Sequence, residues 1–175
     1  GFHFMDLRVK FSKDLRKPEK DFIPFWHIRR AVQSDLDMLK SMARDAFPFS
    51  RFKVDTHFDP VLADRMYEIW IEKDLQLEGH DVWVIDVNNE LAAFTSVSEK
   101  KDGKAQIGLV GTREPWRGKG LSLELQRFIC EELRNEDIWD VEVVTQARNI
   151  SAQNLYQKAG YFTSSIDLWY HKWFD

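Results

Sequence analysis

A glycine-rich segment with two basic side chains lies between an expected strand and an expected helix. It reads R-G-K-G-L-S over Arg117–Ser122 and follows an extended stretch that ends at Val110. Its glycines let the backbone turn its N–H groups inward, and the helix start adds unpaired N–H groups and the positive end of the helix dipole. Such an opening binds phosphate, and Arg117 and Lys119 carry charge suited to a pyrophosphate.

The spacing of this segment excludes two other phosphate-binding motifs. In a Walker A loop the Lys is followed by Ser or Thr, whereas Lys119 is followed by Gly120. The three glycines Gly111, Gly118 and Gly120 do not fit a dinucleotide-binding fingerprint, and no βαβ unit surrounds them. Because glycine-rich turns before helices are common, the segment alone also fits a purely structural role.

A second segment adds a tyrosine and an asparagine on a later helix. It reads N-x-x-A-x-x-L-Y-x-K-x-G-Y over Asn149–Tyr161. Together the two segments resemble the signature regions of the GNAT superfamily of acyl-CoA-dependent N-acyltransferases, whose first region is an R/Q-x-x-G-x-G/A loop. The chain departs from that loop at Ser122, where the superfamily usually has Gly or Ala. The order of elements from Trp26 onward is also similar to that fold.

This resemblance implies that a primary amine attacks the thioester of acetyl-CoA directly, without a covalent enzyme intermediate. A backbone N–H then stabilises the oxyanion, and Tyr156 acts as the general acid toward the departing thiolate. The cofactor-binding residues that it implies are Leu109, Val110, Trp116, Arg117, Gly118, Lys119, Gly120, Leu121, Ser122 and Asn149. Without the resemblance, the sequence favours Tyr156 as an aromatic side chain of the helix that packs on the sheet.

No general base stands out. An α-amino-like amine with a pKa near ~8 is partly neutral at pH 7–8, whereas a lysine amine near ~10.4 is nearly all charged, so a sugar amine would demand less from a base. The candidates, each of which also fits a solvated or structural role, are Glu90, Glu99, His57 and His80. The five histidines show no metal-ligand spacing, so we expect no metal site. Cys130 lies beside Ile129 in a helix pattern and is expected to be a buried, unreactive side chain.

An aromatic loop indicates how the acceptor could be bound. Arg51 could clamp a nucleotide diphosphate while Phe49 or Phe52 stacks on a base or sugar, or Arg51 could be a surface residue of a loop that plugs the core. This loop and the C-terminal stretch 169–174 resemble bacterial N-acetyltransferases of TDP-fucosamine, which acetylate a 4-amino sugar on a nucleotide carrier. The resemblance implies a small nucleotide-linked amino sugar as the acceptor.

Other functions stay open. The acceptor could be a polyamine, an antibiotic or a protein N-terminus, and the chain could be a non-catalytic module that binds acyl-CoA. The aromatic side chains Trp169, Trp173 and Phe174 could form a homodimer contact or cap the core of their own domain. Sugar N-acetyltransferases of the type it resembles pair in this way, which favours a homodimer.

Hydrophobic periodicity predicts the elements that must position these residues. The expected strands are Phe2–Phe11, Trp26–Ala31, Val82–Val87, Leu91–Ser98, Ala105–Val110, Trp139–Thr145 and Phe162–Phe174. The expected helices are Leu36–Ala46, Val61–Leu77, Leu121–Arg134 and Ser151–Ala159, and Phe47–Pro60 is expected to be a loop. This order predicts a mixed α/β fold, GNAT-like, with a largely antiparallel twisted sheet flanked by helices.

Composition bounds the remaining choices. At 175 residues with 43% hydrophobic and 31% charged residues, the chain fits one globular domain. We expect residues 1–22 to be a strand and linker, with an upstream module as one possible origin, and residues 23–175 to be the acyltransferase domain. A net charge of −4 gives no basic field for nucleic acid. The single cysteine and the absence of a long apolar run predict a cytoplasmic protein without a membrane span.

Overall fold

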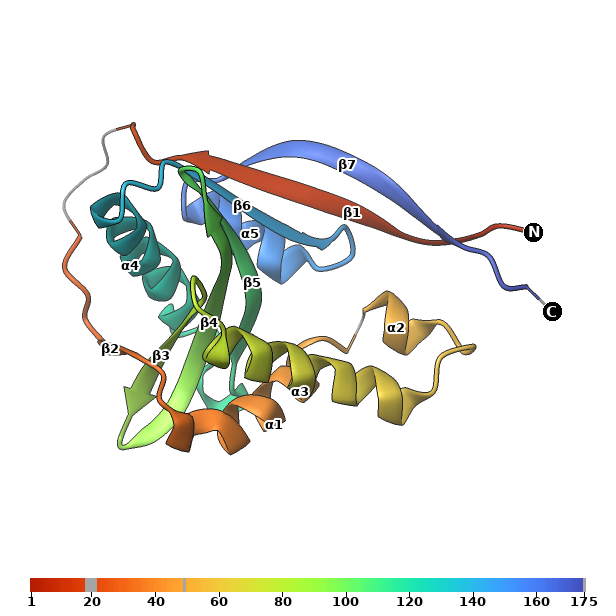
Figure 1. The fold of residues 1–175 in the computed structure, drawn as a ribbon, viewed down its shortest axis with the longest axis horizontal. Helices are drawn as coiled ribbons and strands as arrows, with labels where there is room; N and C mark the ends of the chain where they lie inside the picture. Colours follow the sequence, from red (N-terminus) through yellow and green to blue (C-terminus); the bar gives the residue numbers. More distant parts are fainter. Residues whose placement is uncertain (18–21, 49, 175) are drawn as a thin grey trace.

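The computed structural model describes residues 1–17, 22–48 and 50–174. Within them, seven strands form one sheet in the order β2-β3-β4-β5-β6-β1-β7 (Figure 1). The strands are β1 (His3–Asp14), β2 (His27–Arg30), β3 (Asp81–Val87), β4 (Glu90–Lys101), β5 (Lys104–Thr112), β6 (Asp140–Gln146) and β7 (Phe162–His171). All neighbouring pairs are antiparallel except β5 and β6, which are parallel. The expected mixed α/β fold with a largely antiparallel sheet is therefore confirmed.

Helices cover both faces of the sheet. They are α1 (Leu36–Ala46), α2 (Arg51–Val54), α3 (Pro60–Gln76), α4 (Leu121–Asn135) and α5 (Ile150–Lys158). One core joins apolar side chains of α1 and α3 to alternate positions of β3, such as Val82 and Val84. The other joins α4 and α5 to the opposite positions, such as Trp83 and Ile85, because side chains alternate along a strand. In the described residues, no helix is long and apolar enough to cross a membrane.

The segment 47–60 differs from its expectation as a loop. It contains the short helix α2, which begins after Ser50 and ends at Val54. The apolar pattern of this stretch is too short to reveal one turn of helix, since four residues hold no repeated helical spacing. Helix α2 places Arg51 and Phe52 beside α3.

The N-terminal strand β1 lies inside the sheet. It pairs antiparallel with β6 on one side and with β7 on the other, so that Lys10 lies opposite both Val144 and Ser165. Its inward side chains Val9 and Phe11 are buried in the core beneath α4 and α5. Strands β1 and β7 extend together beyond the body of the molecule, and both ends of the chain lie at the tip of this arm (Figure 1). Residues 3–14 thus share one sheet with the expected acyltransferase domain, while an upstream module stays a prediction.

The parallel strands β5 and β6 separate part of the way along. They pair from Lys104 to Ile107, opposite Asp140 to Val143, and have no pairing beyond that point. Strand β5 also has a bulge there, because its register against β4 shifts between Ile107 and Val110. Consequently Ile107 packs in the α4–α5 core and Leu109, two residues later, packs in the α1–α3 core. The bulge and the separation together open a gap in the middle of the sheet.

Candidate functional site

The start of helix α4 offers backbone donors to an anion. Gly118 and Gly120 have φ of +76° and +87°, in the left-handed region that side chains with a Cβ rarely adopt. Gly120 is the N-cap residue, and no side chain caps the helix. The N–H groups of the first turn have no intrahelical partner and carry the positive end of the helix dipole. The geometry expected from the sequence is thus present at this loop.

The side chains of this loop fix it to the end of β5. The Nε of Arg117 donates to the carbonyl of Thr112 at 3.2 Å, and the hydroxyl groups of Ser122 and Thr112 lie 2.6 Å apart. The Nζ of Lys119 lies 4.4 Å from the centroid of the Trp116 ring. Ser122 at the usual Gly or Ala position therefore joins helix to strand. Leu121 is buried in the core, which leaves only its backbone to contact a ligand.

Tyr156 lies on α5, on the same side of the sheet as α4. Its side chain is 4% exposed and its ring centroid lies 5.6 Å from that of Phe11 and 5.9 Å from that of Tyr161. Burial raises the pKa of Tyr156 above its ordinary value. The hydroxyl therefore stays protonated at neutral pH, where it can donate a hydrogen bond but is a weaker acid than free tyrosine.

Asn149 begins helix α5. Its Oδ1 accepts a hydrogen bond from the backbone N–H of Ala152 at 3.1 Å, which makes it the N-cap of the helix. Since this contact engages the amide oxygen, the amide nitrogen is the part of Asn149 with which a cofactor could form a hydrogen bond.

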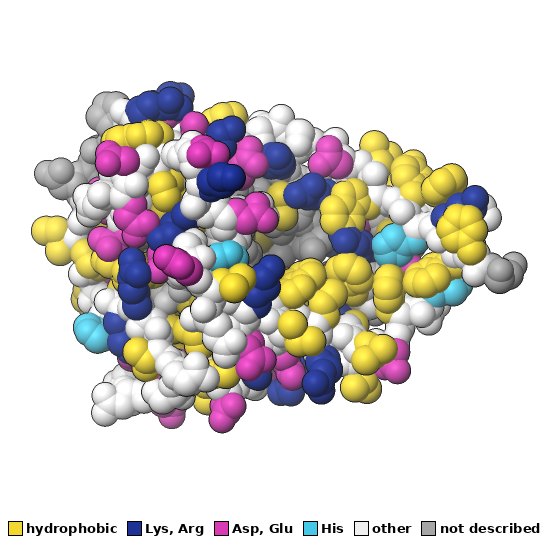
Figure 2. Space-filling model, in the orientation of Figure 1, with side chains coloured by type: hydrophobic (Ala, Val, Ile, Leu, Met, Phe, Trp, Pro, Cys, Tyr) yellow, Lys and Arg dark blue, Asp and Glu magenta, His cyan; other side chains and the backbone are white. Residues whose placement is uncertain are grey.

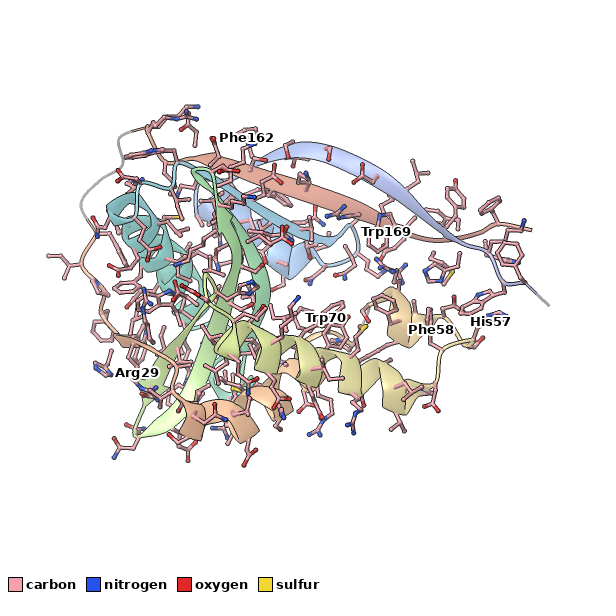
Figure 3. The ribbon with its side chains drawn as sticks, in the orientation of Figure 1. Arg29, His57, Phe58, Trp70, Phe162 and Trp169 are labelled. Atoms are coloured by element: carbon pink, nitrogen blue, oxygen red, sulfur yellow. The ribbon has the colours of Figure 1, made fainter. Side chains whose placement is uncertain are left out.

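A cleft of about 560 Å³ lies on the opposite side of the sheet, between the β1–β7 arm and helices α2 and α3. Figure 2 shows this face hollowed there, with hydrophobic and basic side chains along the hollow. Five aromatic side chains line it: Phe47, Phe52, Tyr67, Trp70 and Trp169. Trp70 on α3 and Trp169 on β7 lie on its two sides (Figure 3). Gly108, Leu109, Val144 and Thr145 also line the cleft, so it reaches the gap between β5 and β6.

Two guanidinium groups flank Trp169 in this cleft. The Cζ atom of Arg51 lies 3.2 Å from the Trp169 ring centroid and 4.3 Å from that of Phe52, and the Cζ of Arg8 lies 5.5 Å from Trp169. Burial lowers the pKa of Arg51, yet the group remains charged at neutral pH. Among the described residues, no carboxylate forms an ion pair with Arg51. Arg51 is thus a cation between aromatic rings, and the charge of Asp6, which lines the same cleft, also acts on it.

The sequence predicted part of this cleft. Arg51 and Phe52 lie there as expected, whereas Phe49 lies outside the described residues. Asp6 and Arg8 were missed, although they line the cleft, because nothing local to the N-terminal strand reveals that it lies next to β7.

The aromatic side chains near the C-terminus are mostly engaged within the chain. Trp169 lies over Arg51, and the Nε1 of Trp173 donates to Oδ2 of the buried Asp55 at 3.3 Å. Asp55 also interacts with the ring nitrogens of His171 and His57, which ties the end of β7 to the loop between α2 and α3. Phe174 is exposed. The homodimer stays a prediction, and the intramolecular contacts of Trp169 and Trp173 are with Arg51 and Asp55 and not with the two hydrophobic cores.

The structure places the four candidate bases in different parts of the molecule. Glu90 pairs with Arg113 at 2.9 Å on the exposed end of β4, and His57 stacks on Trp173 beside Asp55. His80 and Glu99 line the cleft. The cleft therefore brings two of the four candidates toward the gap in the sheet. As expected, Cys130 is buried.

Residues 37–161 match the model of the Acetyltransferase (GNAT) family. The chain is 23% identical over 150 residues to the spore coat polysaccharide biosynthesis protein SpsD of Bacillus subtilis, and the match covers 86% of this chain and 52% of that protein. It is 25% identical over 134 residues to streptothricin acetyltransferase of Escherichia coli, covering 70% of this chain and 77% of that protein. The chain thus spans about half the length of SpsD.

The fold is similar to a solved acetyltransferase structure with bound cofactor. The crystal structure of a Bacillus subtilis acetyltransferase in complex with CoA matches with a TM-score of 0.57 and 19% identity, over 77% of this chain and 75% of that one. At this identity the match concerns the fold alone.

Proposed function

The chain belongs to the acetyltransferase (GNAT) family, in which acetyl-CoA is the acyl donor, and we propose that it acetylates the primary amine of a nucleotide-linked amino sugar. The observation that carries this proposal is the gap between β5 and β6. The donor loop follows the strand β5 that borders this gap, and the aromatic cleft that holds Arg51 reaches the gap from the other face of the sheet.

The donor binds at the start of α4. The pyrophosphate of acetyl-CoA accepts hydrogen bonds from the free N–H groups after Gly120, with Arg117 and Lys119 as nearby cations. The acyl arm then enters the gap between β5 and β6 beside Tyr156. The unpaired edge of β5 supplies the backbone N–H that stabilises the oxyanion.

The reaction is a direct transfer. The lone pair of the amine attacks the thioester carbon, a C–N bond forms, and the C–S bond of acetyl-CoA breaks. The thiolate accepts a hydrogen bond from the Tyr156 hydroxyl as its charge develops. The amine nitrogen loses one proton to a base, so the products are the amide, the CoA thiolate and the protonated base. Because the pKa of Tyr156 is raised, hydrogen bonding carries more of its effect than complete proton transfer does.

The acceptor cleft fits an anionic, planar substrate. Arg51 supplies a cation for a diphosphate, Arg8 lies 5.5 Å from Trp169 and pairs with Asp167 at 3.8 Å, and the aromatic walls give stacking surface for a nucleobase or sugar. TDP-fucosamine has these parts and carries a 4-amino group. The match to a polysaccharide biosynthesis protein supports a sugar acceptor.

A second candidate acceptor is an antibiotic amine, because the chain also matches streptothricin acetyltransferase. Arg8 and Arg51 lie beside Trp169 and favour an anionic acceptor, but the carboxylates Asp6, Asp74 and Glu99 line the same cleft. The match to a polysaccharide biosynthesis protein is therefore what favours the sugar nucleotide.

The test is an acceptor panel. Release of the CoA thiol is followed with acetyl-CoA and, in turn, TDP-fucosamine, the free amino sugar, streptothricin, spermidine and a peptide with a free N-terminus. The proposal expects the highest kcat/KM for TDP-fucosamine and a clear loss when the nucleotide is removed. Streptothricin, spermidine or the peptide as the best acceptor would overturn the sugar assignment, and no thiol release with any amine would overturn the transferase assignment.

A further inference from the structure

His80 and Asp74 form a hydrogen-bonded pair on the wall of the acceptor cleft. The Nδ1 of His80 lies 2.9 Å from Oδ1 of Asp74, and both residues line the cleft. Their side chains are 14% and 11% exposed, which removes most of the competing water. Neither residue belongs to the donor loop or to the helix that carries Tyr156.

The chain holds His80 in place with a tight turn. Helix α3 ends at Gln76, and the N–H of His80 donates to the carbonyl of Leu77 at 3.2 Å. Gly79 has a φ of +79° in this turn, a conformation that favours glycine. Strand β3 begins immediately afterwards at Asp81, so both sides of His80 are anchored in regular structure.

The pair lies against β5 at the point where β5 leaves β6. A Cβ at Gly108 would lie 3.3 Å from Oδ2 of Asp74 and 2.5 Å from Oγ of Ser96. Because Gly108 has no side chain, the carboxylate of Asp74 and the hydroxyl of Ser96 can lie directly against strand β5. Gly108 directly follows Ile107, the last residue of β5 that pairs with β6. The carboxylate–imidazole pair therefore borders the gap in which donor and acceptor meet.

The hydrogen bond determines which ring nitrogen of His80 can accept a proton. An ionised carboxylate only accepts hydrogen bonds, so the neutral imidazole donates from Nδ1 to Asp74. The lone pair is then on Nε2. A carboxylate in this position also stabilises the imidazolium that forms when Nε2 takes a proton.

We propose that His80 is the general base of the acetyl transfer, with Asp74 as the positioning residue that orients it. The step rests on the proposed function. As the amine nitrogen bonds to the thioester carbon, its proton moves to Nε2 of His80, while the C–S bond breaks and the thiolate is stabilised by Tyr156. His80 and Glu99 also line a second hollow.

The test compares H80A and H80Q with a matched control. His57 also pairs with an aspartate, Asp55, at 2.9 Å, but it lies in the loop between α2 and α3, against Trp173, and does not line the cleft. H80Q is expected to lower kcat by roughly 10²–10⁴-fold with unchanged affinity for CoA, whereas H57Q keeps the wild-type kcat. Added imidazole should restore part of the activity of H80A in a saturable way, because it can enter the space left by the side chain.

D74N tests the positioning role. The amide keeps the shape of the carboxylate but cannot stabilise the imidazolium, so kcat should fall while CoA affinity stays unchanged. Imidazole should not restore D74N, because His80 still fills its own place. Retention of kcat within about threefold in H80Q, or loss of activity in H80A without any imidazole response while CoA still binds, would overturn the proposal.

These results are separable from the acceptor assignment. The variants are assayed with whichever amine the wild-type enzyme acetylates fastest. Failure of TDP-fucosamine as an acceptor rejects the sugar assignment and leaves the base to be judged on the H80Q and imidazole results. A wild-type enzyme without transferase activity on any amine rejects both proposals.

Discussion

The two sides of the gap in the sheet are built in different ways. The proposed donor side is centred on one continuous stretch, from Trp116 to Ser122, in which backbone N–H groups and two glycine conformations offer binding atoms for the pyrophosphate. The acceptor side is assembled from β1, α2, α3, the turn before β3, β5, β6 and β7, and its binding atoms belong to side chains. A backbone site serves one constant ligand, whereas a side-chain site can be altered for a new acceptor without disturbing the donor.

Because of this difference, substitutions on the two sides should have different effects on activity. A change on the donor side should affect the reaction with every amine. A change on the acceptor side should affect one class of amine and leave CoA binding intact.

The largest effect is expected at Tyr156, the proposed acid of the transfer. Y156F removes the hydroxyl that donates to the developing thiolate, so kcat should fall by roughly 10²–10⁴-fold for every acceptor. CoA affinity should change little, because the ring still packs on Phe11. The measurements are steady-state kinetics and calorimetric titration with CoA. Full activity of Y156F would assign the residue to packing alone.

The same residue makes a pH prediction. The raised pKa of Tyr156 keeps its hydroxyl protonated above pH 10, the ordinary value for tyrosine. As long as the enzyme stays folded, kcat of the wild type should therefore not fall near pH 10 through ionisation of Tyr156. The pH profiles of the wild type and Y156F should have the same shape in this range. Such a loss, present in the wild type and absent in Y156F, would contradict the buried environment of the hydroxyl.

The next largest effect is expected at the donor loop. G120V places a β-branched side chain at a φ of +87°, which costs about 1–2 kcal/mol or displaces the turn, so CoA affinity should fall by about tenfold or more. G103V is the matched control, because Gly103 has a φ of +74° in the turn between β4 and β5, away from the loop. Equal CoA affinity in G120V and the wild type would show that the pyrophosphate does not bind at this loop.

A smaller and selective effect is expected at Arg51. R51A removes a cation of the acceptor cleft, so KM for a sugar nucleotide should rise by about tenfold while CoA affinity is unchanged. R127A changes an exposed arginine of α4 that does not line the cleft and serves as the control. Equal KM values in R51A and the wild type would place the diphosphate elsewhere.

The smallest effect is expected at Asp55, which joins β7 to the α2–α3 loop. A hydrogen bond from His171, with further ones from His57 and Trp173, lowers the pKa of Asp55 below its ordinary value. This group therefore stabilises the fold above the ordinary pKa, and the contribution is lost as the pH falls. D55N should lower the thermal midpoint by a few degrees at pH 7, and the difference from the wild type should shrink below about pH 4. A difference that grows in acid would contradict this sign.

The difference between a local donor loop and a cleft assembled from distant segments also explains which parts of the site the sequence could predict. The glycine-rich loop and the helix of Tyr156 carry local patterns, and their spans were predicted to within one or two residues. The positions of Arg8, Asp74 and Trp169 around one cleft were not predictable. Strand β1 pairs with strands more than a hundred residues away, and periodicity reports which face of a strand is buried but not which strand lies next to it.

The most direct test of the account is a crystal structure of the protein with bound CoA. The pyrophosphate should contact the backbone N–H groups that follow Gly120, and the sulfur should lie in the gap between β5 and β6 beside Tyr156, with the cleft of Arg51 and Trp169 left for the acceptor. A CoA molecule whose pyrophosphate lies over Arg51 and Trp169 would contradict the assignment of the two sides.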